Sequence, residues 1–175
     1  MDTYKKFRGC GFLEEQSKFH TVRGYQLLSQ NKNLLTSAME DYLEMIYRNS
    51  LVEGYMRINT ISELLNVAAP SATKMVQKLT KLGLLDYKKY GIIFLTENGR
   101  EIGKFLLERH NLIEVFLTNL GVKEDVLTET ELIEHNISVT TLTRINLFNK
   151  FIIQYPEIAK KYREFSKLNL DQSKL

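Results

Sequence analysis

The chain has 175 residues, enough for one large domain or two small ones, and 43% hydrophobic residues, enough for a folded core. Its net charge of +3 and pI near 8.8 permit nucleic-acid binding without requiring it. A single cysteine, Cys10, excludes an internal disulfide and agrees with a reducing compartment. No apolar run approaches the ~20 residues that cross a bilayer, so we expect a cytoplasmic, mainly helical protein.

Residues 1–33 carry aromatic residues scattered among charges and lack the continuous apolar core of a secretion signal. Cys10 and His20 lie in this segment. They could form a metal pair, but a free thiol and a surface imidazole are the simpler interpretation. We treat the segment as an N-terminal extension of unknown role.

A helix is predicted to begin at Ser37, because Ser37 and Glu40 have the spacing of a capping box and apolar residues follow at helical spacing. Asp41 and Glu44 lie three residues apart on its other face. Taken alone, this acidic pair indicates a solvated helix face.

Two further helices follow this first one. Gly54 interrupts the pattern, and Thr60 with Glu63 forms a second capping box that predicts a helix start at Thr60. The next helix has Pro70 in its first turn, where the missing N–H costs nothing, and ends at Gly83. Short strands are predicted at residues 84–87 and 92–95. Helix, short turn, helix and hairpin, in that order, are typical of a winged helix-turn-helix.

The exposed side of the Pro70 helix and the tip of the hairpin are rich in residues that contact DNA. Lysines neutralise phosphates, whereas hydroxyl and amide side chains hydrogen-bond to base edges. The alternative is a lysine-rich helix face that only contacts water, and the basic aromatic hairpin favours DNA. The predicted DNA-binding residues are Pro70, Ser71, Thr73, Lys74, Gln77, Lys78, Lys88, Lys89 and Tyr90.

A long helix is predicted from Thr96 to about Leu120, with His110 among its apolar residues. A lone histidine in such a setting is more often a core residue than a ligand. Ser138 can cap a last long helix over residues 139–154, which carries more apolar surface than a surface helix needs and therefore suggests a dimer interface. Pro156 begins a charged amphipathic tail.

The stretch from Glu131 to His135 carries the clearest chemical signal. Glu131, Glu134 and His135 occupy positions i, i+3 and i+4, which share one face of a helix. The two carboxylates repel each other unless a cation lies between them, and His110 is the obvious distant partner for such a cation. Thr128 and Glu131 also have the spacing of a capping box, which competes with a ligand role for Glu131.

Several segments, in this order and spacing, carry a resemblance to a known family. They are Met39–Tyr47, Thr73–Leu79, Leu95–Thr96, Ile102–Lys104, Arg109–Leu112 and Ile133–His135. Over residues 34–155 the chain resembles the manganese transport regulator branch of the diphtheria toxin repressor family. That family consists of dimeric repressors that bind operator DNA when loaded with divalent metal.

The resemblance implies a mainly α fold with a winged helix-turn-helix DNA-binding domain at residues 34–100. A helical metal-binding and dimerisation domain would follow at residues 101–155, and a C-terminal helical tail at residues 156–175. Residues 1–33 have no counterpart in the short manganese regulators, and the chain ends too early for the SH3-like domain of the iron-responsive members. Ala68 and Ala69 replace bulkier residues at the start of the recognition helix, so operator preference does not carry over.

The resemblance also implies a set of metal ligands. Four carboxylates and two imidazoles without sulfur suit Mn(II) and tolerate Fe(II), and six ligands exceed the needs of a tetrahedral zinc site. We expect two Mn(II) ions per subunit, with Fe(II), Co(II) or Zn(II) as alternatives. One ion would lie near Glu44, His110 and His135, and the other near Asp41 and Glu131, with Glu134 shared.

The expected function is Mn-responsive repression of metal-uptake genes. The partners would be palindromic double-stranded operator DNA and a second copy of the chain, joined through the C-terminal helical domain, with no membrane and no small organic ligand. An iron- or zinc-responsive repressor of the same family is the first alternative, and a metal-independent winged-helix transcription factor is the second. An enzyme with a two-metal cluster is disfavoured, because the sequence offers no further acid or base group for catalysis.

Overall fold

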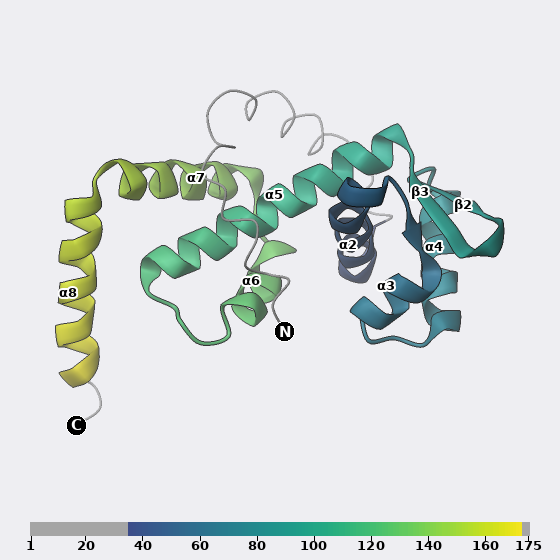
Figure 1. Ribbon diagram of the computed structural model, residues 1–175. Helices are drawn as coiled ribbons and strands as arrows, with labels where there is room; N and C mark the ends of the chain where they lie inside the picture. The colour runs from purple at the N-terminus through teal and green to yellow at the C-terminus, as the bar shows by residue number, and fades with distance from the viewer. Residues whose placement is uncertain (1–34, 173–175) are drawn as a thin grey trace. The chain divides into compact units, whose positions relative to one another are not determined.

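The computed structural model describes residues 35–172, so the interpretations of Cys10 and His20 lie outside the described residues. The chain divides into two compact units, with the boundary between Phe105 and Leu106. The expected architecture is confirmed: the first unit is a winged helix-turn-helix and the second is helical (Figure 1). Among the described residues, no helix is long and apolar enough to cross a membrane.

The first unit holds a three-stranded antiparallel sheet with the strand order β1-β3-β2. In the central strand, Ile93 faces Met56 on one side and Tyr87 on the other. The elements in chain order are α2 (Ser37–Glu53), β1 (Met56–Arg57), α3 (Ile58–Leu64), α4 (Ala69–Lys81), β2 (Leu85–Lys88), the 3-10 turn η2 (Lys89–Gly91), β3 (Ile92–Leu95) and the first part of α5 (Glu97–Leu120).

The core of the first unit is assembled from four helices and the central strand of the sheet. Side chains of α2, α3, α4, β3 and α5 meet there with no exposed surface, which removes several hundred square ångströms of apolar area from water. The completely buried residues in this unit include Leu43, Ile46, Ile61, Val76, Leu79, Ile93 and Ile102.

The predicted start of α2 at Ser37 is confirmed, but the predicted cap is wrong. Thr36 is the N-cap: its backbone is extended, with φ −88° and ψ 161°, and its hydroxyl accepts from the Met39 N–H. Ser37 is the first helical residue, so its side chain cannot cap. Two adjacent residues of similar capping propensity made the sequence ambiguous at this point.

The helix start predicted at Thr60 is also wrong. Helix α3 begins at Ile58, directly after β1, and Arg57 precedes it without a side-chain cap. Strand β1 was not predicted. Because β1 pairs with β3, its extended backbone continues to Arg57, and the helix begins where that pairing ends.

In the second unit, α5 is followed by α6 (Val126–Glu134), α7 (Val139–Gln154) and α8 (Pro156–Gln172). Ser138 caps α7 as predicted and accepts from the Thr141 N–H at 3.1 Å. The third capping box is wrong, because Asp125 precedes α6 and Thr128 lies inside the helix. Thr128 and Glu131 therefore do not form a capping box, and no capping role competes with metal binding by Glu131.

Helices α5 and α7 contact each other through an aromatic pair and a buried amide. The rings of Phe116 and Phe148 meet edge to face, with centroids 5.5 Å apart. Asn149, which is buried, donates to the Leu112 carbonyl at 2.9 Å and accepts from the Asn119 amide at 3.1 Å. A satisfied buried amide of this kind sets the register between the two helices.

Gly99, in the first turn of α5, is expected to tolerate no larger residue. A Cβ atom there would meet the Leu84 backbone carbonyl, which cannot move without disturbing the start of β2. Gly99→Ala should therefore lower the free energy of unfolding by about 1–3 kcal/mol, the usual range for overpacking. The measurement is urea unfolding of the metal-free protein. Asn98→Ala, at the exposed neighbouring position, serves as the control and should change stability by less than about 0.5 kcal/mol.

Candidate metal centre and DNA-binding face

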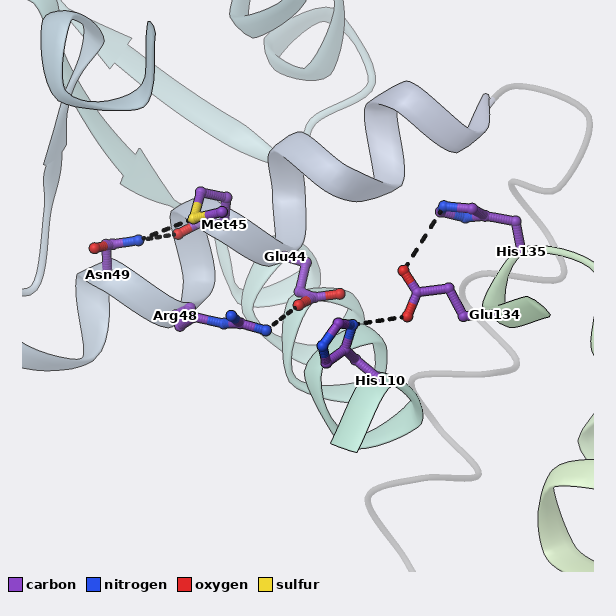
Figure 2. A network of polar contacts seen from close by, with 7 residues as sticks. All are labelled: Glu44, Met45, Arg48, Asn49, His110, Glu134 and His135. Carbon is purple, nitrogen blue, oxygen red and sulfur yellow. Dashed lines mark hydrogen bonds and ion pairs between the residues drawn. The ribbon is translucent and has the colours of Figure 1, made fainter. Parts of the chain in front are cut away.

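In the second unit, one carboxylate lies between two imidazoles. His110 comes from α5, Glu134 is the last residue of α6, and His135 is the residue that follows. The Nδ1 of His110 lies 3.0 Å from Glu134 Oε2, and the Nε2 of His135 lies 3.8 Å from Glu134 Oε1. Figure 2 shows one oxygen of Glu134 turned towards the ring of His110 and the other towards the ring of His135.

The backbone explains why two consecutive residues reach the same place. His135 has φ −75° and ψ −19°, so the chain keeps a helical conformation one residue beyond the end of α6. Thr130, one turn earlier on the same face as Glu134, is completely buried. This face of α6 therefore points inward, and Glu134 follows it.

Burial makes this group of residues chemically unusual. Glu134 is 2% exposed and His110 is 6% exposed. Removing a carboxylate from water costs several kcal/mol unless a cation or hydrogen-bond donors compensate. The carboxylate oxygens of Glu134 and the imidazole nitrogens beside them are ligand atoms that suit a divalent cation of hard or borderline character.

In the first unit, Asp41 and Glu44 lie on the same side of α2, but in different environments. Asp41 is exposed, whereas Glu44 is buried and accepts from Arg48 Nη2 at 2.6 Å (Figure 2). The interpretation of this pair as a solvated acidic face therefore fails for Glu44. Burial also raises the pKa of the Tyr42 phenol, which lies between them in the sequence, above its usual value of 10.0.

The structure thus brings three of the six predicted ligands together in one unit: His110, Glu134 and His135. Asp41 and Glu44 share one helix of the other unit. Glu131 lies on α6 three residues before Glu134, with its side chain exposed.

Sequence analysis missed two arginines that contact predicted ligands. Arg48 contacts Glu44, and its position four residues later on the same helix was a signal that could have been used. Arg109 lies with one guanidinium nitrogen 3.4 Å from His135 Nδ1. No local signal reveals this second contact, because the two residues are 26 positions apart in the sequence.

Helix α4 separates apolar from polar residues as predicted. Ala72, Val76 and Leu79 are completely buried, whereas the opposite face presents polar and basic side chains to solvent. Thr73 is the exception, since its hydroxyl donates to the Ala69 carbonyl at 2.9 Å and is half-buried. The exposed predicted residues of this helix are Pro70, Ser71, Lys74, Gln77 and Lys78.

The hairpin between β2 and β3 presents its tip to solvent. Tyr90 has 91% of its surface exposed and a backbone φ of 64°, a left-handed conformation that turns the chain at the tip. Lys89 is exposed beside it, and Lys88 is paired with Asp86 at 2.6 Å. An exposed aromatic ring of this size has no packing role in the unit, which agrees with a contact surface.

Two family models match consecutive parts of the chain. One, for the N-terminal DNA-binding domain of iron-dependent repressors, matches residues 34–93, and the other, for their metal-binding and dimerisation domain, matches residues 96–163. The chain belongs to the iron-dependent repressor family. This confirms the family expected from the sequence, with DNA and a second copy of the chain as partners.

Individual relatives agree with this assignment. The chain is 42% identical to the HTH-type transcriptional regulator MntR of Lysinibacillus sphaericus over 127 residues, which cover 72% of this chain and 91% of that protein. It is 45% identical to MntR of Bacillus subtilis over 113 residues, covering 64% of this chain and 80% of that protein.

Solved structures agree as well. The manganese regulator SloR matches with a TM-score of 0.58 at 34% identity, and the metal-dependent transcriptional regulator MtsR with 0.59 at 31%. Each match covers 65% of this chain and 54% of the other, so the chain spans about half of those two structures.

In this repressor, α7 carries apolar side chains that its own unit leaves exposed. Leu147 and Ile153 are 58% and 61% exposed, and Phe151 is 41% exposed. Arg144, Leu147, Phe148 and Phe151 line a shallow apolar depression along the helix. An apolar surface of this kind suits a dimerisation domain, as the sequence suggested.

The exposed lysines of α4 should contribute to binding of every DNA sequence. Lys74→Ala or Lys78→Ala should weaken DNA binding and reduce the slope of log affinity against log salt by about 1, because one phosphate contact is lost. Lys160→Ala, an exposed lysine on α8, is the matched control and should leave the slope unchanged. Fluorescence anisotropy at several salt concentrations measures this.

The polar residues of the same face should act differently. Replacing Ser71 or Gln77 should alter the preference among operator bases rather than the salt slope. If both lysine variants keep the wild-type slope, another face of the unit contacts DNA.

Proposed function

We propose that this protein is a manganese-responsive repressor of metal-uptake genes. It binds a palindromic operator in the cytoplasm as a homodimer when loaded with Mn(II). The observation that carries the proposal is a buried carboxylate, Glu134, flanked by His110 and His135 in the metal-binding domain. The recognition helix α4 of the same chain presents its polar and basic face to solvent. Relatives at 42% and 45% identity are named as MntR regulators, and SloR is described as a manganese regulator.

The proposed metal centre consists of Asp41, Glu44, His110, Glu131, Glu134 and His135, and it holds two ions. The ligand atoms are carboxylate oxygens and imidazole nitrogens, which suit Mn(II) better than a sulfur-containing set would. The intrinsic affinity order places Zn(II) and Co(II) above Mn(II), so selectivity depends on coordination geometry and on metal supply.

The mechanism follows from the distribution of these residues over the two family domains. Asp41 and Glu44 belong to the DNA-binding domain, whereas Glu131, Glu134 and His135 belong to the dimerisation domain. When bound, divalent metal supplies the positive charge that lets carboxylates of both domains gather.

Without that charge the carboxylates repel each other, and the two domains are free to change their relative position. With a cation held by these residues, the recognition helices of a dimer would be kept about 34 Å apart, or a multiple of that distance, which fits two half-sites of a palindrome. The proposed ligands of the two domains would thus favour one conformer of a pre-existing equilibrium when they hold a divalent cation.

The central test removes the metal. Treatment with a chelator followed by dialysis should abolish specific operator binding, and added Mn(II) should restore it. Titrations of Mn(II), Fe(II) and Zn(II) against a palindromic promoter fragment, followed by anisotropy, establish the order of response. Operator affinity that survives complete metal removal would contradict the proposal.

Selectivity should depend on the hard oxygen of Asp41. Asp41→Met replaces an anionic oxygen with a thioether, which Mn(II) coordinates poorly. The variant should respond less to Mn(II) and relatively more to Fe(II) or Co(II), while its fold and dimer persist. Glu131→Cys should act in the same direction, and the two changes should be non-additive if both side chains serve one cluster.

Two exposed acids provide matched controls for these variants. Glu63→Met on α3 and Glu129→Cys on α6 make the same chemical changes outside the proposed ligand set. Both controls should keep the wild-type metal response, measured as metal-dependent anisotropy of the operator. A wild-type Mn(II) response in Asp41→Met would reduce the centre to fewer than six ligands.

A further inference from the structure

A buried arginine contacts one of the proposed metal ligands. Arg109, on α5, is 4% exposed, and its Nη2 lies 3.4 Å from Nδ1 of His135. The side chain of His135 is 14% exposed and is approached from the other side by Glu134. All three residues lie in the second unit.

The chemistry of the two groups fixes which atom donates. An arginine guanidinium has only donors, so Nδ1 of His135 must accept through its lone pair. In the neutral ring the proton then resides on Nε2, which faces Glu134 Oε1 at 3.8 Å. Arg109 and Glu134 thus engage both nitrogens of this ring in the arrangement that the structure shows.

A metal ion needs a lone pair on one of these nitrogens. Coordination through Nδ1 displaces Arg109 directly. Coordination through Nε2 moves the proton to Nδ1, where it faces the N–H groups of Arg109 and breaks the contact. By either route, His135 becomes a ligand only after the guanidinium has left.

Two other contacts on proposed ligands do not have this property. His110 donates its Nδ1–H to Glu134, the arrangement that orients a histidine to coordinate through its other nitrogen. Arg48 contacts Oε1 of Glu44, and a carboxylate has a second oxygen. The contact of Arg109 with His135 is therefore the one of these that excludes coordination.

We propose that Arg109 is a positioning residue that competes with the metal for His135 and so raises the Mn(II) concentration at which the repressor responds. The inference rests on the proposed function, since it takes His135 as a ligand. It adds to that function a role for the Arg109 guanidinium, which occupies His135 and prevents it from coordinating metal until the metal concentration is high enough to displace the arginine.

The first experiment measures Mn(II) affinity of the full chain by competition with a fluorescent chelator. Arg109→Met, an apolar replacement of similar length that suits a buried site, should bind Mn(II) about tenfold more tightly than the wild type, because the hydrogen bond from a charged donor is gone. Arg109→Lys keeps a charge and a donor and should stay near the wild-type affinity. Arg163→Gln, an exposed arginine on α8, removes the same charge and should have no effect.

The second experiment observes the ring itself in the wild-type protein, which avoids any folding problem of the methionine variant. Nitrogen NMR of the imidazole side chains distinguishes a nitrogen with a lone pair from one with a proton. The sequence has three histidines, so His→Gln variants assign the signals. Metal-free His135 should show the lone pair on Nδ1, and Zn(II), as a diamagnetic probe, should change this signal.

The outcomes separate the inference from the proposed function. If His135→Gln leaves Mn(II) affinity unchanged, His135 is not a ligand and the proposed centre fails. If His135→Gln weakens binding while Arg109→Met binds Mn(II) no more tightly than the wild type, only the role of Arg109 is wrong. A proton on Nδ1 of metal-free His135 at neutral pH would also overturn that role.

Discussion

The metal-binding unit depends on how the carboxylate of Glu134 is accommodated at 2% exposure. A charge so far from water is tolerated only when donors or cations compensate it, and removing one partner of such a pair costs about 3–5 kcal/mol. Helix α5 provides that compensation by placing His110 at 3.0 Å. The contact between His110 and Glu134 therefore both joins α5 to α6 and places an imidazole beside the buried carboxylate.

Arginines recur beside the acidic and imidazole groups of this protein. Arg48 contacts Glu44 at 2.6 Å in the first unit, and Arg109 contacts His135 at 3.4 Å in the second. Resident cations of this kind stabilise a negatively charged site while it holds no metal, since they reduce the repulsion among carboxylates. The same contacts oppose metal binding wherever they occupy the atom that the metal needs. If His135 is a ligand, as proposed, stability of the metal-free state and sensitivity to metal would be coupled through Arg109.

In the DNA-binding unit, the two faces of α4 differ in burial. Its apolar side anchors the helix through residues with no exposed surface, such as Val76 and Leu79. The other side presents polar and basic side chains to solvent. Ala68 and Ala69, at the start of this helix, are exposed, so their small size changes the surface offered to DNA without disturbing the core.

Local patterns in the sequence determined much of this structure. Periodicity of 3.6 residues, glycines at helix ends and the Ser138 cap predicted α2, α4, α5 and α7, and two short β runs predicted the hairpin. Each of these signals acts within a few residues of chain. The resemblance of short segments to a known family supplied the candidate ligands and the expected metal. These were inferences about which residues matter, not about where they lie.

Tertiary structure decided what depends on distant partners. Strand β1 has two residues and forms only because β3 lies beside it, and this pairing moved the start of α3 from Thr60 to Ile58. The burial of Glu44 and Glu134 and the contact between Arg109 and His135, 26 residues apart, follow from how helices pack. A sequence specifies which side chains a helix carries and at what spacing. Which of them lose contact with water, and which atom faces which, is set by the neighbouring helices, because desolvation and hydrogen bonding act through space and not along the chain.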